Sequence, residues 1–131
     1  MTRHRQHGFT LIELMIVISI ILILVSIAVP IYSRSIVQAR EAVLRDDLFT
    51  LRSVIDQFTL DKQRAPQSLQ DIVEAGYLRD IPVDPFTQSR DTWVVVQEDV
   101  MQSIDQTQPG ITDVHSGASG TGSDGRAYSE W

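Results

Sequence analysis

Glu13 is a single carboxylate in a long apolar stretch, a position that calls for a positively charged partner. The stretch runs from Phe9 to Val29 and contains no other charged residue. A charge inside a bilayer costs on the order of 1–3 kcal/mol unless a partner neutralises it. Residues 9–33 contain no Lys, Arg or His. The partner must therefore come from elsewhere, and the pattern indicates self-association.

The residues before Glu13 offer one such partner. If a peptidase cuts after Gly8, Phe9 becomes the new N-terminus and carries a charged amino group close to the depth of Glu13. An ordinary secretory signal would instead be cut after the apolar stretch, where Ser26-Ile27-Ala28 matches the usual small-residue pattern only weakly. Only the cut after Gly8 keeps the apolar stretch in the mature chain.

The apolar stretch itself is long enough to span a membrane. Its 21 residues, at about 1.5 Å each, form a helix of roughly 31 Å. Arg3 and Arg5 precede it, and basic residues are enriched on cytoplasmic flanks. We therefore expect a single-pass helix with a cytoplasmic N-terminus and an exported remainder.

The segment Gly8-Phe9-Thr10-Leu11-Ile12-Glu13 resembles the processing site of type IV pilins and type II secretion pseudopilins. The resemblance implies that a prepilin peptidase cuts after Gly8 and methylates the new amino group of Phe9. It also implies that Glu13 pairs with the amine of a neighbouring subunit during filament assembly. Pro30 stands where this family has a helix-kinking proline.

The resemblance also divides the chain into three parts. Residues 1–8 are expected to be a cleaved leader, residues 9–29 a transmembrane and assembly helix, and residues 30–131 an exported pilin-like globular domain. The expected fold is α+β: a long N-terminal helix, half transmembrane and half amphipathic, packs on a small C-terminal antiparallel sheet.

Apolar residues at helical spacing continue the helix beyond Pro30, which removes one backbone donor and can kink it. They recur at steps of three and four and form one stripe: Leu44, Leu48, Leu51, Ile55 and Phe58. Glu41 and Arg45 lie four residues apart, in the order that favours an ion pair on a helix. We predict that a globular head buries the stripe.

A polar break at 61–66 and a second short helix follow. Ser68 and Asp71 resemble a capping box, and Gly76 suits the helix end. One face of this helix is apolar: Leu69, Ile72 and Val73. Residues 81–86 contain two prolines and are predicted to form an ordered loop whose Ile81, Val83 and Phe86 seal the core.

The segment from Gly76 to Phe86 resembles a loop of the major pseudopilin of type II secretion, in which an Asp-Pro-aromatic sequence follows Tyr-Leu and Pro. Surface pilins lack this loop and often close their C-terminal end with a disulfide. The chain has no cysteine, which agrees with the pseudopilin branch.

The C-terminal third is predicted to be a small sheet. Residues 92–97 and 111–115 are rich in β-branched and aromatic residues and indicate two strands. Residues 127–131 are predicted as a short third strand. Val100–Ile104 fits either a strand or a helical turn.

A glycine-rich loop, residues 116–125, separates the last two predicted strands. In the pseudopilin family the corresponding loop binds calcium, and Ser116, Ser119 and Asp124 are the best matches here. Calcium takes six to eight oxygen ligands, and its affinity falls with fewer carboxylates. Because this loop supplies only Asp124, both a calcium site and an ion-free loop are left open.

The net charge and the histidine content of the chain bear on two possible functions, nucleic-acid binding and catalysis. Loss of Arg3 and Arg5 would leave nine basic and 17 acidic residues, a formal charge of −8, which argues against nucleic-acid binding. His115 would be the one remaining histidine, and Ser116 beside it in a strand would point to the opposite face. The chain is therefore predicted not to be an enzyme.

Together these features predict the structural subunit of a type II secretion pseudopilus in the inner membrane, which assembles into a periplasmic or extracellular filament. Its expected partners are further copies of itself, the prepilin peptidase, an inner-membrane assembly platform and minor pseudopilins. The alternatives are a type IV pilin for adhesion or motility and a membrane-anchored extracytoplasmic binding module.

Overall fold

The computed structural model of the chain describes residues 8–98 and 109–131, so the ambiguous segment Val100–Ile104 lies outside the described residues. These described residues divide into two units, one within residues 1–37 and one within residues 38–131.

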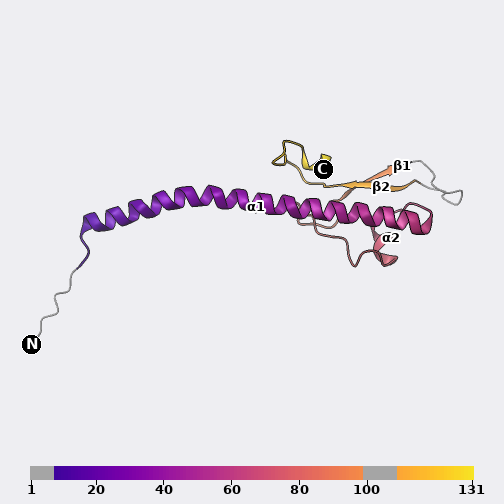
Figure 1. Cartoon of the computed structure of the whole chain (residues 1–131), viewed down its shortest axis with the longest axis horizontal. Helices are drawn as coiled ribbons and strands as arrows, with labels where there is room; N and C mark the ends of the chain where they lie inside the picture. Colours follow the sequence, from indigo (N-terminus) through magenta and orange to yellow (C-terminus); the bar gives the residue numbers. More distant parts are fainter. Residues whose placement is uncertain (1–7, 99–108) are drawn as a thin grey trace, which may run out of the picture. The chain divides into compact units, whose positions relative to one another are not determined.

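The elements follow in a simple order (Figure 1). They are helix α1 (Leu11–Lys62), helix α2 (Leu69–Glu74), strand β1 (Val94–Glu98), strand β2 (Gly110–His115) and a 3-10 turn at Tyr128–Glu130. The two strands form one antiparallel sheet. A long N-terminal helix with a small antiparallel sheet confirms the predicted α+β class.

Helix α1 begins and ends where the sequence supplies caps. The Thr10 hydroxyl accepts a hydrogen bond from the main-chain N–H of Glu13 at 3.2 Å, which satisfies one of the free donors of the first turn. After Lys62, Gln63 adopts a φ of 54°, the left-handed conformation that ends many helices. The break predicted at 61–66 is present but begins two residues later than predicted, at Gln63.

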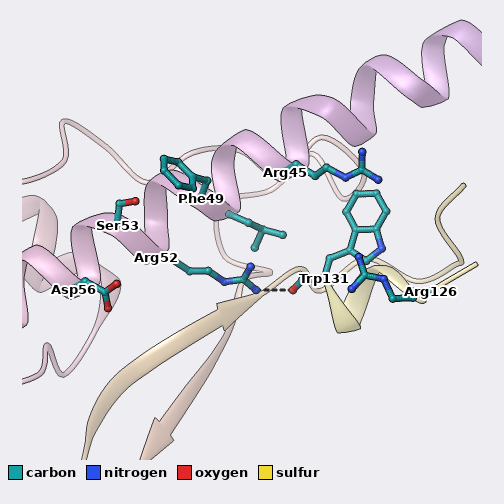
Figure 2. Close-up of a pocket in the computed structure, with 8 residues that line it drawn as sticks. Arg45, Phe49, Arg52, Ser53, Asp56, Arg126 and Trp131 are labelled. Carbon is teal, nitrogen blue, oxygen red and sulfur yellow. Dashed lines mark hydrogen bonds between the residues drawn. The ribbon is translucent and has the colours of Figure 1, made fainter. Parts of the chain in front are cut away.

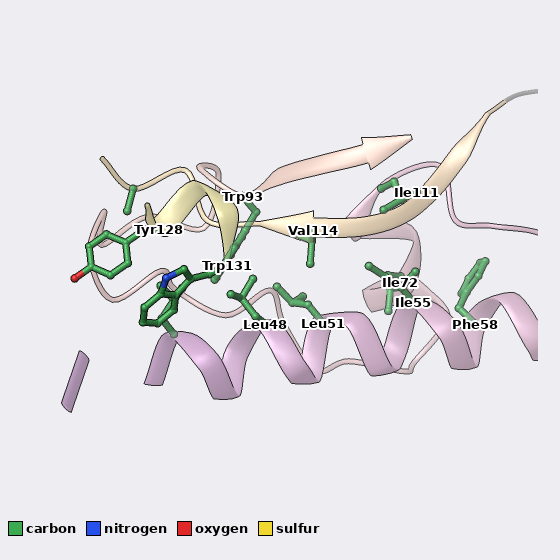
Figure 3. Close-up of a cluster of buried hydrophobic side chains, with 12 residues drawn as sticks. Leu48, Leu51, Ile55, Phe58, Ile72, Trp93, Ile111, Val114, Tyr128 and Trp131 are labelled. Carbon is green, nitrogen blue, oxygen red and sulfur yellow. The ribbon is translucent and has the colours of Figure 1, made fainter. Parts of the chain in front are cut away.

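The predicted apolar stripe of α1 lies at the centre of the hydrophobic core of residues 38–131 (Figure 3). Its five members are at most 3% exposed: Leu44, Leu48, Leu51, Ile55 and Phe58. Side chains from the rest of this unit cover them, including Ile72, Trp93, Ile111, Val114, Tyr128 and Trp131. The predicted burial of the stripe is confirmed.

Strand β2 crosses the linker between the two helices at close range. The main-chain N–H of Ile111 donates to the carbonyl of Pro66 at 2.8 Å. A Cβ at Gly110 would lie 2.3 Å from the Cβ of Ala65, so only glycine allows this approach. Next to it, Ile111 turns into the core and is 1% exposed.

Helix α2 has the predicted capping box. The main-chain N–H of Asp71 donates to the Ser68 hydroxyl, and the N–H of Ser68 donates to the Asp71 carboxylate, both at 3.2 Å. Gly76 follows the helix with a φ of 85°. The box orients α2 so that Ile72 is fully buried.

The predicted third strand at 127–131 is wrong, because Tyr128–Glu130 forms a 3-10 turn. Tyr128 and Trp131 are both buried, and their ring centroids lie 5.2 Å apart. Residues three apart point to opposite faces of a strand, whereas a 3-10 turn aligns them on one side. Burial of both rings therefore favours the turn, and of this segment Ala127 alone forms a bridge, with Thr121.

Val83 does not help to seal the core as predicted, since it is 43% exposed. Ile81 and Phe86 do pack against the core. The interior position between them belongs to Asp84, which is fully buried. The loop 81–86 therefore turns its acidic residue inward, where neighbouring donors satisfy the carboxylate, and leaves a valine in solvent.

Two phenylalanines of α1 give a matched test of this core. Phe58 is 3% exposed, whereas Phe49 is 71% exposed. Phe58→Ala should lower the free energy of unfolding by about 3–5 kcal/mol, and Phe49→Ala should change it by less than about 0.5 kcal/mol. Urea unfolding of the full chain in detergent, followed by the fluorescence of Trp93 and Trp131, measures both. Equal losses would contradict the assigned core.

Candidate functional site

The predicted processing residues, Gly8 and Phe9, lie just before α1, and the predicted assembly residue, Glu13, lies in its first turn. Phe9 is 84% exposed, and a side-chain carbon added at Gly8 would meet nothing within 4 Å. Glu13 is exposed in the first turn of α1, where the free N–H groups of a helix favour a carboxylate. The Gly8–Phe9 peptide bond is therefore accessible to a peptidase, and the Glu13 side chain is accessible to another molecule.

From Leu11 to Val29, α1 presents an apolar surface. Its large apolar side chains are 45–82% exposed, and this is the one helix in the described part of the chain that is long and apolar enough to cross a membrane. The hydroxyls of Ser19 and Ser26 donate to main-chain carbonyls of the same helix, both at 2.7 Å. These serines thus bring no unsatisfied donor into lipid.

Helix α1 continues through Pro30 without interruption. Proline lacks an N–H, so the carbonyl of Ser26 loses its usual donor four residues later. One turn beyond, the Ser33 hydroxyl donates to the carbonyl of Val29 at 3.1 Å. The proline therefore does not end the helix, and the kink predicted there stays a prediction.

The three predicted calcium ligands have different surroundings. Ser116 is buried, and its hydroxyl donates to the Asp84 carboxylate at 2.5 Å. Ser119 is exposed. Asp124 is exposed and accepts hydrogen bonds from the main-chain N–H and the Nε–H of Arg126, at 3.0 and 2.9 Å. The hydrogen bond from the main-chain N–H of Arg126 is the main cause that lowers the pKa of the Asp124 carboxyl, and the charge of Arg126 lowers this pKa further.

These side chains do not fit a calcium ligand set. The Asp124 carboxylate faces the Arg126 guanidinium, whose charge opposes a cation, and the Ser116 hydroxyl is turned toward Asp84. Within residues 8–98 and 109–131, no group of three or more His, Cys, Asp or Glu side chains could hold a metal ion. Of the two alternatives that the sequence left open, a calcium site and an ion-free loop, this arrangement of side chains favours the ion-free loop.

A shallow groove of about 400 Å³ lies beside α1 within residues 38–131 (Figure 2). Arg45, Phe49, Arg52 and Ser53 of α1 form one wall, and Arg126 and Trp131 contribute from the C-terminal segment. The Arg52 guanidinium is already engaged: it pairs with Asp113 at 2.7 Å and donates to the main-chain oxygen of Trp131 at 2.6 Å. The Arg52 guanidinium in this groove is thus occupied by contacts that stabilise the fold.

His115 and Ser116 do not form a nucleophile and base. The Nδ1 atom of His115 lies 2.7 Å from the main-chain oxygen of Trp131, and its Nε2 atom lies 3.5 Å from Asp113. The Ser116 hydroxyl is turned to Asp84 instead. The two neighbours in sequence therefore serve separate structural contacts.

Comparison with known proteins places this sequence in a family. A model of the prokaryotic N-terminal methylation motif matches residues 3–29. The type II secretion system core protein G of Klebsiella pneumoniae is 36% identical over 98 residues, which make up 63% of this chain and 70% of that protein. The chain belongs to the type II secretion system core protein G family. The core protein G of Pseudomonas aeruginosa is 33% identical over 102 residues, or 66% of this chain and 72% of that protein.

Similarity to surface pilins is shorter. The type IV major fimbrial protein FimA of Dichelobacter nodosus is 40% identical over 62 residues, which make up 47% of this chain and 39% of that protein. The core protein G matches extend over more of the chain, which favours the pseudopilin branch, as predicted. No solved structure matches the chain.

Sequence reasoning missed two buried carboxylates in this core protein G relative. Asp84 is fully buried and accepts hydrogen bonds from the main-chain N–H of Phe86 at 2.9 Å and from Ser116. Glu41 is 2% exposed. A signal for Glu41 was present, since it lies three residues before Leu44 and thus continues the buried stripe toward the N-terminus.

Proposed function

We propose that the chain is the structural subunit of a type II secretion pseudopilus, which polymerises through its N-terminal helix to drive protein export across the outer membrane. The observation that carries the proposal is the similarity to core protein G over about two thirds of the chain. The methylation motif at residues 3–29 and the exposed apolar helix behind it support the same role.

The assembly chemistry follows from Phe9 and Glu13. Hydrolysis of the Gly8–Phe9 bond leaves a carboxylate on Gly8 and a charged amine on Phe9. That amine neutralises the Glu13 carboxylate of a neighbouring copy, so neither charge stays unpaired in an apolar filament core. The apolar surface from Leu11 to Val29 exchanges lipid for neighbouring helices, which changes apolar burial little, so extraction from the membrane requires external work.

The proposed location and partners follow from this cycle. The subunit waits in the inner membrane as a single-pass protein with a cytoplasmic N-terminus, then enters a periplasmic or extracellular filament. Its partners are the prepilin peptidase, the inner-membrane assembly platform, the minor pseudopilins and further copies of the chain. The role is structural rather than enzymatic.

A type IV pilin for adhesion or motility is the second candidate, and the match to a fimbrial protein supports it. That match spans less of the chain than the core protein G matches do. Deletion of the gene separates the two, because loss of a pseudopilus stops protein export, whereas loss of a surface pilus removes attachment or twitching movement.

Processing gives the first test of this proposal. Because Gly8 has open space around it, Gly8→Leu should leave the fold intact and block the peptidase. Intact-mass measurement should show loss of residues 1–8 and one methyl group on Phe9 in the natural chain, and the full leader in Gly8→Leu. A full leader on the subunits of functional filaments would contradict the proposal.

Assembly gives the second test. Glu13→Val and Glu13→Gln should each lower filament yield about tenfold or more, since either change leaves the incoming amine unpaired. Membrane-bound monomer should be unchanged. The exposed Glu74 lies outside the apolar helix, so Glu74→Gln is the charge-matched control and should assemble normally. Sheared filaments and membrane fractions are quantified by immunoblot. Normal filaments from Glu13→Val would refute the charge pair, and absent filaments in the natural strain would favour the binding-module alternative.

A further inference from the structure

Glu41 is a charged residue in the interior of residues 38–131. It lies on α1 one turn before the apolar stripe and is 2% exposed. A buried carboxylate is costly unless several donors satisfy it. All the hydrogen bonds that the structure gives to its side chain come from the C-terminal segment of the chain, more than 80 residues later.

The donors surround both carboxylate oxygens. Oε1 accepts from the main-chain N–H of Ser123 at 2.8 Å and from the Tyr128 hydroxyl at 2.9 Å. Oε2 accepts from the Ser123 hydroxyl at 2.5 Å. A carboxylate that accepts three such bonds can hold a loop, because each bond to a charged group is stronger than a neutral one.

Two arginines of α1 reach the same segment. The Arg45 guanidinium lies 4.5 Å from the centre of the Trp131 ring. Arg52 donates to the main-chain oxygens of Val114 and Trp131 at 2.9 and 2.6 Å. Figure 2 shows both guanidinium groups beside Trp131. Residues 41, 45 and 52 are spaced by four and seven, which places them along one face of the helix.

Contacts within the segment, and one ring contact with Phe86, complete the closure. Tyr128 donates its main-chain N–H to the carbonyl of Gly120 at 3.1 Å, and Gly122 donates to the carbonyl of Arg126 at 2.7 Å. The Tyr128 ring stacks on Phe86 with the centroids 4.2 Å apart.

We propose that Glu41 closes residues 116–131 onto α1 as an internal anion, so that this closure requires the Glu41 carboxylate and no calcium. The resemblance to pseudopilins implies instead that a calcium ion holds this loop. Here the negative charge is supplied by the helix, and the loop contributes the donors. The proposal does not depend on the pseudopilus role, because it concerns the stability of the folded subunit.

The titration of the neighbouring groups is consistent with this arrangement. The Ser123 hydroxyl bond, with smaller contributions from Tyr128 and the charge of Arg45, lowers the pKa of Glu41. Burial and the bond to Glu41 raise the pKa of Tyr128, and the charge of Asp124 adds to the rise. The closed state therefore favours an ionised glutamate beside a protonated tyrosine.

The test uses the full chain in detergent micelles. Glu41→Gln keeps the size of the side chain but removes its charge, and Ser123→Ala removes one hydroxyl donor. The control is Glu74→Gln, which removes the same charge from an exposed position. Each variant is melted with millimolar calcium and with chelator, and Trp93 and Trp131 fluorescence reports unfolding. Trypsin cleavage after Arg126, measured by mass spectrometry, reports opening of the segment.

We expect the natural chain to melt at the same temperature with calcium and with chelator. Glu41→Gln should lower Tm by about 5–15 °C and Ser123→Ala by roughly half as much, with cleavage after Arg126 accelerated about tenfold in Glu41→Gln. Calcium should restore neither variant, and Glu74→Gln should match the natural chain. If Glu41→Gln does not fold, Ser123→Ala carries the test alone.

Two results of these melting and cleavage measurements would overturn the proposal. The first is a calcium-dependent rise in the Tm of the natural chain that Asp124→Ala removes, which would make the ion the holder of the loop. The second is a Ser123→Ala or Glu41→Gln variant whose Tm and cleavage rate equal those of Glu74→Gln.

Acid unfolding adds a separate readout of the same carboxylate. Because the pKa of Glu41 is lower in the folded chain, its contribution to stability is present above the usual glutamate value of about 4.3 and is lost as pH falls through the lowered value. The difference in Tm between the natural chain and Glu41→Gln should therefore shrink below about pH 4. A difference that stays constant down to pH 2 would show that charge at Glu41 is irrelevant.

Discussion

The apolar stripe of α1 is the surface on which residues 38–131 assemble, and the small elements depend on it for their burial. A two-stranded sheet and a six-residue helix cannot enclose a core by themselves. Leu51 and Ile55 supply the missing face, and β2, α2 and the C-terminal aromatic rings each contribute side chains to it. The helix is thus both the scaffold of the head and its largest source of apolar surface.

Burial of that stripe sets the position of the polar contacts around it. Glu41 and Asp84 are buried carboxylates at the edge of the core, and each accepts hydrogen bonds from groups distant in sequence. Arg52 joins α1 to β2 and to the end of the chain. A buried charge without partners is strongly destabilising. The loops that carry the partners must therefore lie next to these charges, and the contacts fix the positions of the loops without adding to apolar burial.

The N-terminal part of α1 differs from the stripe, because the chain does not bury its apolar side chains. Its apolar side chains are exposed over the whole stretch from Leu11 to Val29, so they require lipid or other helices around them. One continuous helix therefore has two kinds of surface. Up to Val29 its apolar side chains are exposed, and beyond Gln38 its apolar stripe forms the core of a folded head.

Several local features of this protein follow from the spacing of residue types along the sequence. The motif from Gly8 to Glu13, the apolar stripe of α1, the capping box of α2 and the two strands are all short-range patterns, and the sequence alone was sufficient to predict them. The tertiary structure decided what depends on distant partners. It made Tyr128–Glu130 a 3-10 turn instead of part of a strand, because this places the rings of Tyr128 and Trp131 on the same side. It also placed Asp84 inside instead of Val83, and it gave Glu41 donors from Ser123 and Tyr128, residues that no local pattern connects to the helix.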